Sequence, residues 1–367
     1  MTTPGHGSCA LMTITTDRIT ELRAKRRRAA VATLVATTGG AIRRLGETMW
    51  VDDQGAIVGS VTIGGCVDGR AVELAETVLR SGTSQRVSLP LGDEDAWAFG
   101  MTCAGNVDLL VEPVDVTAAN DPIASAADAI AIALRAGHAA IEVVSTGPVP
   151  RRFIVLDDGT RHGSLGDETL EGAIAERVSS LLETRAVGLI DVPGEHGTSE
   201  VFVQVHAPPA SIVIMGATDV AVALVKLAGP LGFHTTVIDG RDRWANRERF
   251  PTADVIRVGI PSELVAGMPL VGASALILVA HDFKYDLPVL EVALNSTVGY
   301  IGVLGSQRRA TVIRETLATM GFAPESIDRI RVPVGLSIGA RTPAEIALSV
   351  LAEVVAVRNG RAPARGA

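Results

Sequence analysis

The stretch SIVIMGATDVA, residues 211–221, decides the fold of the second half of the chain. A short apolar run ends at Gly216, where a strand would pass into a helix. Similar apolar runs recur downstream at HTTVIDG, ADVIRVG, SALILVA and GYIGVLG, with helical stretches between most of them. Strands that alternate with helices build a doubly wound parallel sheet. The sequence therefore predicts an α/β fold with a Rossmann-like domain over residues 208–360.

The glycine after this first strand belongs to an altered dinucleotide fingerprint. Residues 216–221 read GATDVA in the place of G-x-G-x-x-G, so Thr218 and Ala221 replace two glycines. Alanine is tolerated at the third position, but threonine puts a side chain where a pyrophosphate approaches the backbone. Asp239 ends the next strand, which is the place of a ribose-binding acid. The pattern indicates the fold, argues against an ordinary NAD(P) site, and leaves open a phosphate-bearing ligand in another pose.

Further polar residues follow other strands of the same predicted sheet. Because ligands of open α/β sheets bind at the carboxyl edge, these positions are candidates for binding. Gly-Ser followed by paired arginines at a helix start can form an anion cradle. Taken singly, each residue has a plain alternative as a strand cap or a surface side chain. The candidates are His281, Ser306, Arg308, Arg309 and Arg341.

The first half of the chain repeats one strand-rich α/β plan twice. AAIEVVSTG at residues 139–147 matches ATLVATTG, FIVLDDGTRHGSL matches TMWVDDQGAIVGSV, and SEVFVQVHAPP matches NVDLLVEPV. Strand–turn–strand–helix units can resemble one another by chance, but the shared order TG, RR, DDxG and GS favours duplication. We expect the copies at residues 16–118 and 119–207. Residues 1–15 and 361–367 are expected to lack structure.

The two copies differ in their cysteines. Cys66 follows the pair Gly64 and Gly65 at a predicted helix start. Cys103 stands before the last strand of the first copy, and the second copy has neither cysteine. A thiol at a helix N-terminus has a lowered pKa, and its thiolate can bind a soft metal, accept sulfur or act as a nucleophile. A small buried hydrophobe is the plain alternative, but restriction to one copy favours a functional Cys66 with Cys103 as its partner.

Composition and charge exclude several classes of function. Hydrophobic residues are 47% and aromatic residues only 3%, which predicts a globular core of aliphatic side chains. The formal net charge of −8 gives no basis for binding nucleic acid or an anionic membrane. No apolar run is long enough for a transmembrane helix. Three cysteines without zinc spacing or an export signal predict free thiols in the cytoplasm, and Cys9 is read as incidental.

Several longer motifs resemble one known protein family. ATTGGAIRRLGETMWV, GSVTIGGCVDG and CAGNVDLLVEP in the first copy are similar to the N-terminal signature of the XdhC/CoxI family. RFPTADVIRVG, HDFKYDLPVL, YIGVLGSQRR and VGLSIGARTPAEIALSVLAEVVAVRNG are similar to its last domain. The likeness covers residues 29–115 and 208–360. It implies a thiol-bearing, strand-rich unit together with a Rossmann-like sheet.

The resemblance implies a role in the maturation of molybdenum hydroxylases such as xanthine dehydrogenase and carbon monoxide dehydrogenase. Members that resemble XdhC bind molybdenum cofactor, shield it while a cysteine desulfurase supplies the terminal sulfur, and deliver it to the apoenzyme. The family's Gly-Gly-Cys motif makes Cys66 the lead candidate beside the molybdenum, and its Cys-Gly-Gly motif falls on Cys103, Ala104 and Gly105. Ala104, and Asp68 where glutamate is common, depart from the family pattern. The residues expected to hold the molybdopterin phosphate or a nucleotide are Ser306, Arg308, Arg309 and Arg341.

Two other functions remain open from the sequence. An NAD(P)-dependent oxidoreductase would bind its dinucleotide at Gly216 and Asp239 and use Cys66 as a redox thiol. A protein-interaction module would use the cysteines only for packing, so that Cys66→Ala would change nothing but stability. We favour an accessory cofactor chaperone over a catalyst. Its expected partners are an apo molybdenum hydroxylase and a cysteine desulfurase, and a homodimer is expected.

Overall fold

The computed structural model describes residues 10–39, 45–62, 67–91, 105–118, 120–271, 274–280 and 282–361. The chain separates into two compact units, of which one spans Leu11–Pro208 and the other contains Pro209–Ala367. Across these described ranges, no helix combines the length and the apolar character that a membrane span requires.

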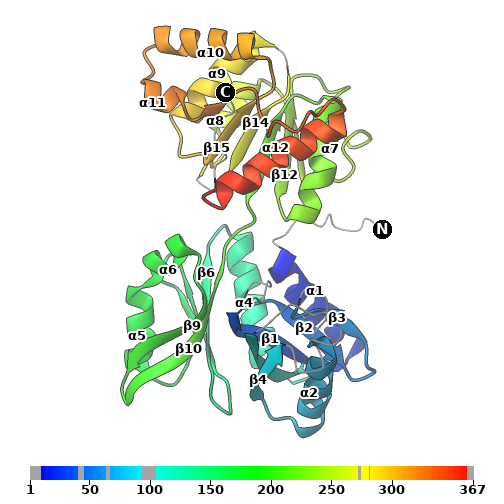
Figure 1. The fold of residues 1–367 in the computed structure, drawn as a ribbon, viewed down its shortest axis with the longest axis vertical. Coiled ribbons are helices and arrows are strands. Elements are labelled where there is room, and N and C mark those ends of the chain that lie inside the picture. The colour runs from blue at the N-terminus through cyan, green and yellow to red at the C-terminus, as the bar shows by residue number, and fades with distance from the viewer. Residues whose placement is uncertain are drawn as a thin grey trace. The chain divides into compact units, whose positions relative to one another are not determined.

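Within its described residues, the first copy forms an antiparallel sheet of five strands with two helices (Figure 1). Its elements are α1 (Ala10–Lys25), β1 (Arg28–Gly39), β2 (Thr48–Asp52), β3 (Ile57–Gly59), α2 (Asp68–Ser81), β4 (Gln85–Leu91) and β5 (Gly105–Asp115). The strand order is β3-β2-β1-β5-β4. Helix α2 buries Ala71, Ala75 and Val78 and ends at Ser81, with Gly82 as its C-cap in the left-handed conformation.

The second copy repeats this topology. Its elements are α4 (Pro122–Arg135), β6 (Ala140–Ser145), β7 (Arg152–Leu156), β8 (Arg161–Gly163), α5 (Glu168–Glu176), α6 (Val178–Thr184), β9 (Val187–Gly194) and β10 (Gly197–His206). The strand order β8-β7-β6-β10-β9 matches that of the first copy position by position. The helical pattern over residues 168–183 proves to be two helices that meet at Arg177.

A polar contact at the start of each sheet shows how closely the copies correspond. Ahead of β1, the Arg27 side chain donates from Nε to Asp53 in the β2–β3 turn at 2.7 Å. Ahead of β6, the His138 ring lies 2.8 Å from Asp157 in the β7–β8 turn. His138, Asp157 and Asp158 are close enough together to hold a metal ion. Arg27 occupies the matching position of the first copy and cannot bind a metal ion. We therefore interpret the His138–Asp157 contact as one that stabilises the β7–β8 turn.

Helix α1 begins at Ala10, within the segment expected to lack structure. The expectation that residues 1–15 lack structure is therefore wrong for residues 10–15. Alanine, leucine and methionine at residues 10–12 favour a helix, whereas the threonines that follow obscure the periodic pattern.

The two sheets of the Leu11–Pro208 unit pack with one face toward each other. Helices α1 and α4 cover the rest of these inner faces, and α2, α5 and α6 pack on the outer faces. Beside the apolar contact, Arg152 of β7 donates to both carboxylate oxygens of Glu112 on β5, at 2.8 and 2.6 Å. An ion pair therefore joins one copy to the other. The apolar cluster between the sheets comprises Val35, Leu110, Val144 and Phe202.

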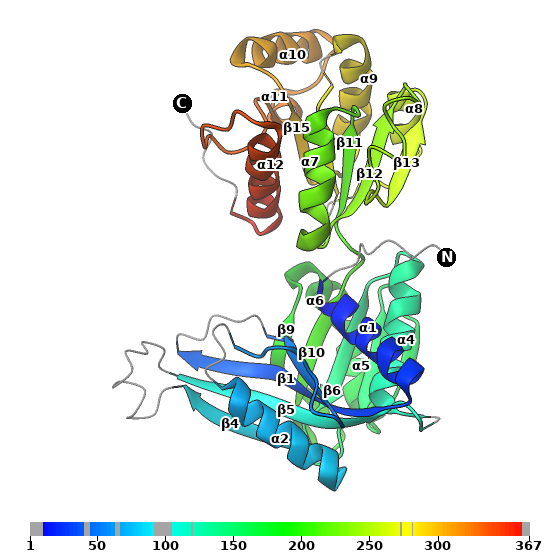
Figure 2. The same ribbon diagram turned by 90° about the vertical axis from the view of Figure 1, so that its right-hand side faces the viewer.

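The unit that contains Pro209–Ala367 is the predicted Rossmann-like domain (Figure 2). Its elements are β11 (Ser211–Met215), α7 (Asp219–Ala228), η1 (Gly229–Leu231), β12 (His234–Asp239), β13 (Val255–Val258), α8 (Pro261–Ala266), β14 (Ala275–Leu278), α9 (Phe283–Leu294), β15 (Tyr300–Val303), α10 (Gln307–Thr319), α11 (Pro324–Ile327), β16 (Ile330–Arg331) and α12 (Pro343–Arg358). All pairings in this sheet are parallel, and the order is β13-β12-β11-β14-β15-β16. This is the 3-2-1-4-5-6 order of dinucleotide-binding folds, which confirms the predicted fold class.

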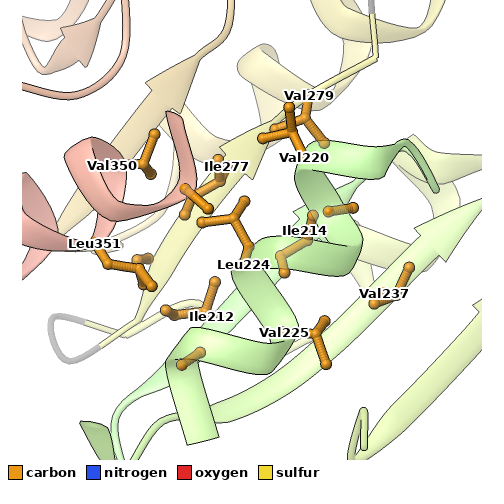
Figure 3. Packing of buried hydrophobic residues seen from close by; sticks show 14 of the residues in the cluster. Ile212, Ile214, Val220, Leu224, Val225, Val237, Ile277, Val279, Val350 and Leu351 are labelled. Atoms are coloured by element: carbon orange, nitrogen blue, oxygen red, sulfur yellow. The ribbon is translucent and has the colours of Figure 1, made fainter. Parts of the chain in front are cut away.

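Aliphatic side chains cover both faces of this sheet. On one face, Leu224 and Val225 of α7 pack over Ile212 and Ile214, with Val350 of α12 beside them (Figure 3). On the other face, α8, α9, α10 and α11 bury a second aliphatic cluster. The strand order reverses between β11 and β14, and ligands bind at such a switch point on the carboxyl edge.

The start of α12 is determined by local sequence. Thr342 is the N-cap, Pro343 occupies the first turn, and Glu345 completes a capping box with the Thr342 side chain. The helix ends at Arg358, two residues before the glycine that marks its end in the sequence.

Candidate functional site

Five of the residues proposed from the sequence lie outside the described residues, namely Gly64, Gly65, Cys66, Cys103 and His281. Their proposed roles stay predictions. The described part of the chain resumes at Val67, which is the N-cap of α2 and makes no side-chain capping hydrogen bond. Asp68 in the first turn accepts a hydrogen bond from the Thr62 hydroxyl at 3.1 Å.

Apart from Arg341, the remaining candidates gather at the carboxyl edge of the Rossmann-like sheet, where two cavities open. The first, which we call the switch-point cavity, has a volume of about 550 Å³. Gly216 lies at its base with φ of +102°, and a Cβ there would come within 2.7 Å of the Ala280 backbone nitrogen. Only glycine fits this close approach. The residues that shape the rest of the cavity are Thr218, Asp239, Arg241, Ile260, Asp282 and Tyr285.

The carboxylate of Asp239 lies in the switch-point cavity with all of its acceptor sites in use. One oxygen accepts from the Arg241 backbone N–H at 3.0 Å and from its Nε at 2.9 Å. The other accepts from the Ala217 backbone N–H at 2.7 Å and from Arg241 Nη2 at 2.9 Å. Burial tends to raise the pKa of Asp239, but the hydrogen bonds from Arg241 and Ala217 hold it below its usual range. A carboxylate offers about four acceptor positions, so none is left for a ribose hydroxyl.

The N-terminus of α7, where a pyrophosphate would bind, is likewise occupied by the chain itself. The Thr218 side chain caps the helix by accepting from Ala221 N–H. Asp219 places a carboxylate in the first turn, and Arg249 pairs with it at 2.9 Å. Arg249 also donates to the Ala217 carbonyl at 2.8 Å. A carboxylate already interacts with the positive end of this helix, which disfavours a second anion there.

The exposed ring of Trp244 makes cation–π contacts with two arginines near the switch-point cavity, Arg241 and Arg249. The guanidinium carbons of Arg241 and Arg249 lie 5.1 and 4.8 Å from the centroid of the Trp244 ring. Sequence reasoning did not single out Trp244 or Arg249. The signal lay in RDRWANRERF, residues 241–250, where four arginines surround one tryptophan.

The second cavity, which we call the α10 cleft, has a volume of about 680 Å³ and contains three predicted residues. Ser306 is the N-cap of α10, whose first turn carries no acidic residue. Arg308 is exposed and makes no hydrogen bond or ion pair within the described part of the chain. Apolar walls face these polar groups. The wall residues are Phe283, Leu304, Val312 and Ile346.

Arg309 differs from its neighbour because its charge is already paired. Its guanidinium donates to Asp286 of α9, which is completely buried. The Arg309 stem crosses Gly305, where a Cβ would lie 2.5 Å from Arg309 Cδ. This crossing explains the glycine in GYIGVLGS. Sequence reasoning missed Asp286, although the DFKYD motif contained it.

Arg341 lies in neither cavity. It precedes the N-cap of α12, its side chain is exposed, and its backbone N–H donates to Glu345 at 2.8 Å. The structure therefore brings Ser306, Arg308 and Arg309 together in one cleft, places Gly216 and Asp239 in the other, and leaves Arg341 outside both.

Asp286→Asn should remove a pH dependence of stability. Burial raises the pKa of Asp286 to about 6, although the Arg309 charge acts in the opposite direction. Between about pH 4 and pH 6 the folded state holds a proton that the unfolded state has lost, so stability falls as pH rises, by about 3 kcal/mol in all. Urea unfolding from pH 4 to pH 7 measures this slope. Glu291→Gln, on the exposed side of the same helix, is the control, and equal slopes in wild type and Asp286→Asn would contradict the assignment.

Comparison with known proteins identifies both parts of the chain. A family model described as the XdhC Rossmann domain matches residues 212–354, and one described as the XdhC and CoxI family matches residues 22–90. A probable xanthine dehydrogenase subunit of Bacillus subtilis (strain 168) is 25% identical over 333 residues, which cover 90% of this chain and 93% of that protein. Molybdenum cofactor insertion chaperone PaoD of Escherichia coli (strain K12) is 27% identical over 331 residues, which cover 90% and 83%.

A solved structure with a similar fold also has a name related to xanthine dehydrogenase. The crystal structure of a protein from Bacillus halodurans, described as a xanthine dehydrogenase, matches with a TM-score of 0.77 and 25% identity. The match covers 95% of this chain and 96% of that one. Together the two family models span more than half of the chain, in the two regions where its motifs had indicated the same family. The chain belongs to the XdhC and CoxI family.

Proposed function

We propose that this protein binds molybdenum cofactor and assists its sulfuration and its insertion into an apo molybdenum hydroxylase of the xanthine dehydrogenase or carbon monoxide dehydrogenase type. The names of two relatives, a cofactor insertion chaperone and a xanthine dehydrogenase subunit, support this proposal. The observation that carries it is the α10 cleft, in which an unpaired Arg308 faces apolar walls. Such a cleft suits an organic ligand that carries a phosphate, as molybdopterin does.

Within the α10 cleft, Arg308 and Ser306 would hold the phosphate. Arg309 would contribute less charge, because Asp286 already neutralises it. Arg341 would take part only if a ligand extended beyond the cleft. Independently of this cleft, the sequence motif makes Cys66 the residue proposed beside the molybdenum, with Cys103 as its partner.

The closely spaced glycines before Cys66 would allow the backbone to approach the cofactor. We further propose that the protein is a cytoplasmic homodimer that receives sulfur from a cysteine desulfurase. Handover, rather than catalysis by this chain, is the proposed activity. Molybdenum cofactor is thus the proposed cargo, and Gly64 and Gly65 are proposed as cofactor-binding residues together with Cys66.

The alternative NAD(P)-dependent oxidoreductase finds less support. A dinucleotide needs an acceptor for its ribose and a helix N-terminus for its pyrophosphate. Asp239 has no acceptor left, and Asp219 with Arg249 occupies the start of α7. NAD(P) could bind in the usual pose only if Asp239 lost its present hydrogen bonds and the N-terminus of α7 became accessible.

Retention of molybdenum cofactor tests the proposed function. Purified protein is incubated anaerobically with the cofactor and gel-filtered, and the pterin is oxidised and measured by fluorescence. Wild type should retain about one equivalent. Cys66→Ala and Arg308→Ala should each retain less by about tenfold or more, since each loses a contact to a charged or metal-bound group. Cys9→Ala is the matched thiol control and should behave as wild type.

Two results would overturn this proposal. Absence of pterin from wild type would remove the carrier function. Tight binding of NADH with hydride transfer to an added acceptor would favour the oxidoreductase. If wild type and Cys66→Ala retained equal amounts of molybdenum cofactor, the carrier function would stand, but Cys66 would have no role in binding.

A further inference from the structure

The switch-point cavity has apolar walls that remain exposed although the domain is folded. Ile260, the N-cap residue of α8, is 52% exposed, and Tyr285 in the first turn of α9 is 41% exposed. Helices α8 and α9 pack against each other, so both side chains belong to one rim of the cavity. Lys284 lies 5.6 Å from the centroid of the Tyr285 ring. Exposed apolar and aromatic walls in a concave site favour a flat organic ring.

One free polar group in this cavity is a hydrogen-bond acceptor, the carboxylate of Asp282. Asp282 is the N-cap of α9, and its Oδ1 accepts from the Lys284 backbone N–H at 3.1 Å. Within the described residues, its Oδ2 accepts no hydrogen bond. The cationic side chain of the cavity, Arg241, is paired with Asp239. The cavity therefore selects ligand groups that donate hydrogen bonds over phosphates.

We propose that the switch-point cavity binds the donor edge of an aminopyrimidinone ring, with Asp282 as acceptor and with Ile260 and Tyr285 against the ring. Such a ring, as in pterins and guanine, presents an amino group and an adjacent ring N–H on one edge. A carboxylate accepts from both, and these charge-assisted hydrogen bonds are stronger than neutral ones. The choice of a pterin rests on the proposed function, since molybdopterin carries this edge.

This assignment gives the two cavities of the sheet edge different chemistry. The α10 cleft offers the unpaired Arg308 and suits an anion, whereas the switch-point cavity offers Asp282 and suits a donor. A ligand with an aminopyrimidinone ring and a phosphate is complementary to both kinds of group. NAD(P) presents phosphates and ribose hydroxyls where this chain has Asp219 and a saturated Asp239, so it is the wrong class of ligand for the cavity.

Two matched ligands test the proposal on the full-length protein. 6-Methylpterin has the amino donor, and 6-methyllumazine has a carbonyl oxygen in its place. Binding of each is followed by pteridine fluorescence anisotropy. We expect wild type to bind the pterin about tenfold or more tightly than the lumazine, because the lumazine carbonyl would oppose the Asp282 carboxylate.

Asp282→Asn keeps the size and the capping oxygen of the side chain, since asparagine is also a favoured N-cap. It should weaken pterin binding by about tenfold or more and abolish the preference for pterin. Asp219→Asn, a carboxylate at the same sheet edge outside the cavity, is the control and should change neither. Equal affinity for the two ligands, or unchanged pterin binding in Asp282→Asn, would overturn the proposal.

The same variants separate this inference from the proposed function. Full retention of molybdenum cofactor by Asp282→Asn would overturn the placement of its ring here while the carrier function stands. If wild type binds 6-methylpterin selectively but retains no molybdenum cofactor, the ring-binding proposal for the cavity is supported. The same result contradicts the proposal that molybdenum cofactor is the cargo. NADH that competes with 6-methylpterin would overturn the assigned ligand class.

Discussion

Arg152→Met is expected to lower the free energy of unfolding of the Leu11–Pro208 unit by about 3–5 kcal/mol. Arg152 donates to Glu112 of the other copy at 2.8 and 2.6 Å and to Glu142 at 3.1 Å. The exposed fractions of these side chains are 9%, 4% and 16%. Methionine would fill a similar volume but leave Glu112 as a buried charge without its cation. Removal of one member of a buried pair costs more than the pair itself contributes.

Glu142 shows how strongly this cluster favours its charged form. Burial tends to raise its pKa, but a hydrogen bond from His206 and the charges of Arg152 and His206 outweigh burial and lower it to about 2. A carboxyl with a depressed pKa contributes stability that is present above about pH 4.5 and is lost as the pH falls toward 2. The unit should therefore be sensitive to acid.

Hydrogen exchange measured by mass spectrometry follows the Arg152→Met effect in the full-length protein, because peptides from β6 and β7 report on this unit alone. Arg151→Met is the matched control, since Arg151 is its exposed neighbour and should change stability by less than about 0.5 kcal/mol. Glu112→Gln in the Arg152→Met background should recover part of the loss by removing the unpaired charge. Equal protection in Arg151→Met and Arg152→Met would show that the ion pair does not hold the copies together.

The elements of the fold that could be predicted from the sequence are those fixed by local chemistry. The strand–helix alternation after residue 211, the C-cap of α2 at Gly82 and the capping box of Thr342 and Glu345 are all found in the structure. Each depends on residues within one turn or one strand of each other. The two copies share one strand order, and each carries the same sequence of strands and turns.

The partners of charged side chains could not be predicted in the same way. Arg308 and Arg309 are adjacent in sequence, yet Arg308 has no ion pair among the described residues, whereas Arg309 is paired with a buried acid 23 residues away. Arg151 and Arg152 also differ, because Arg151 is exposed and donates to the Leu165 carbonyl at 3.4 Å, whereas Arg152 pairs with Glu112. Asp239 reached the expected sheet edge, but Arg241 two residues later uses its acceptor sites. Burial and pairing depend on contacts between elements far apart in the chain.

Glu353→Ala should lower the stability of the Rossmann-like unit by about 3–5 kcal/mol. Glu353 of α12 is nearly buried and accepts hydrogen bonds from β15, β16 and the segment that precedes α12. Its carboxylate accepts from the Tyr300 hydroxyl at 2.6 Å, the Gly335 N–H at 2.8 Å and Arg331 at 3.0 Å. Burial and the negative charge of Glu353 raise the pKa of Tyr300 well above its usual value. Truncation would leave all three donors without this acceptor.

Gly335 begins the segment that leads to Arg341 and the N-cap of α12, so loss of Glu353 should also increase hydrogen exchange over residues 335–342. Tyr300→Phe removes one donor and should cost only about 1 kcal/mol. Adding Glu353→Ala to Tyr300→Phe should cost less than Glu353→Ala alone, because one of the orphaned donors is already gone. Glu315→Gln, an exposed change on α10, is the control and should leave stability unchanged. Full additivity of Glu353→Ala and Tyr300→Phe would mean that the two side chains act independently, and that the carboxylate does not tie α12 to β15.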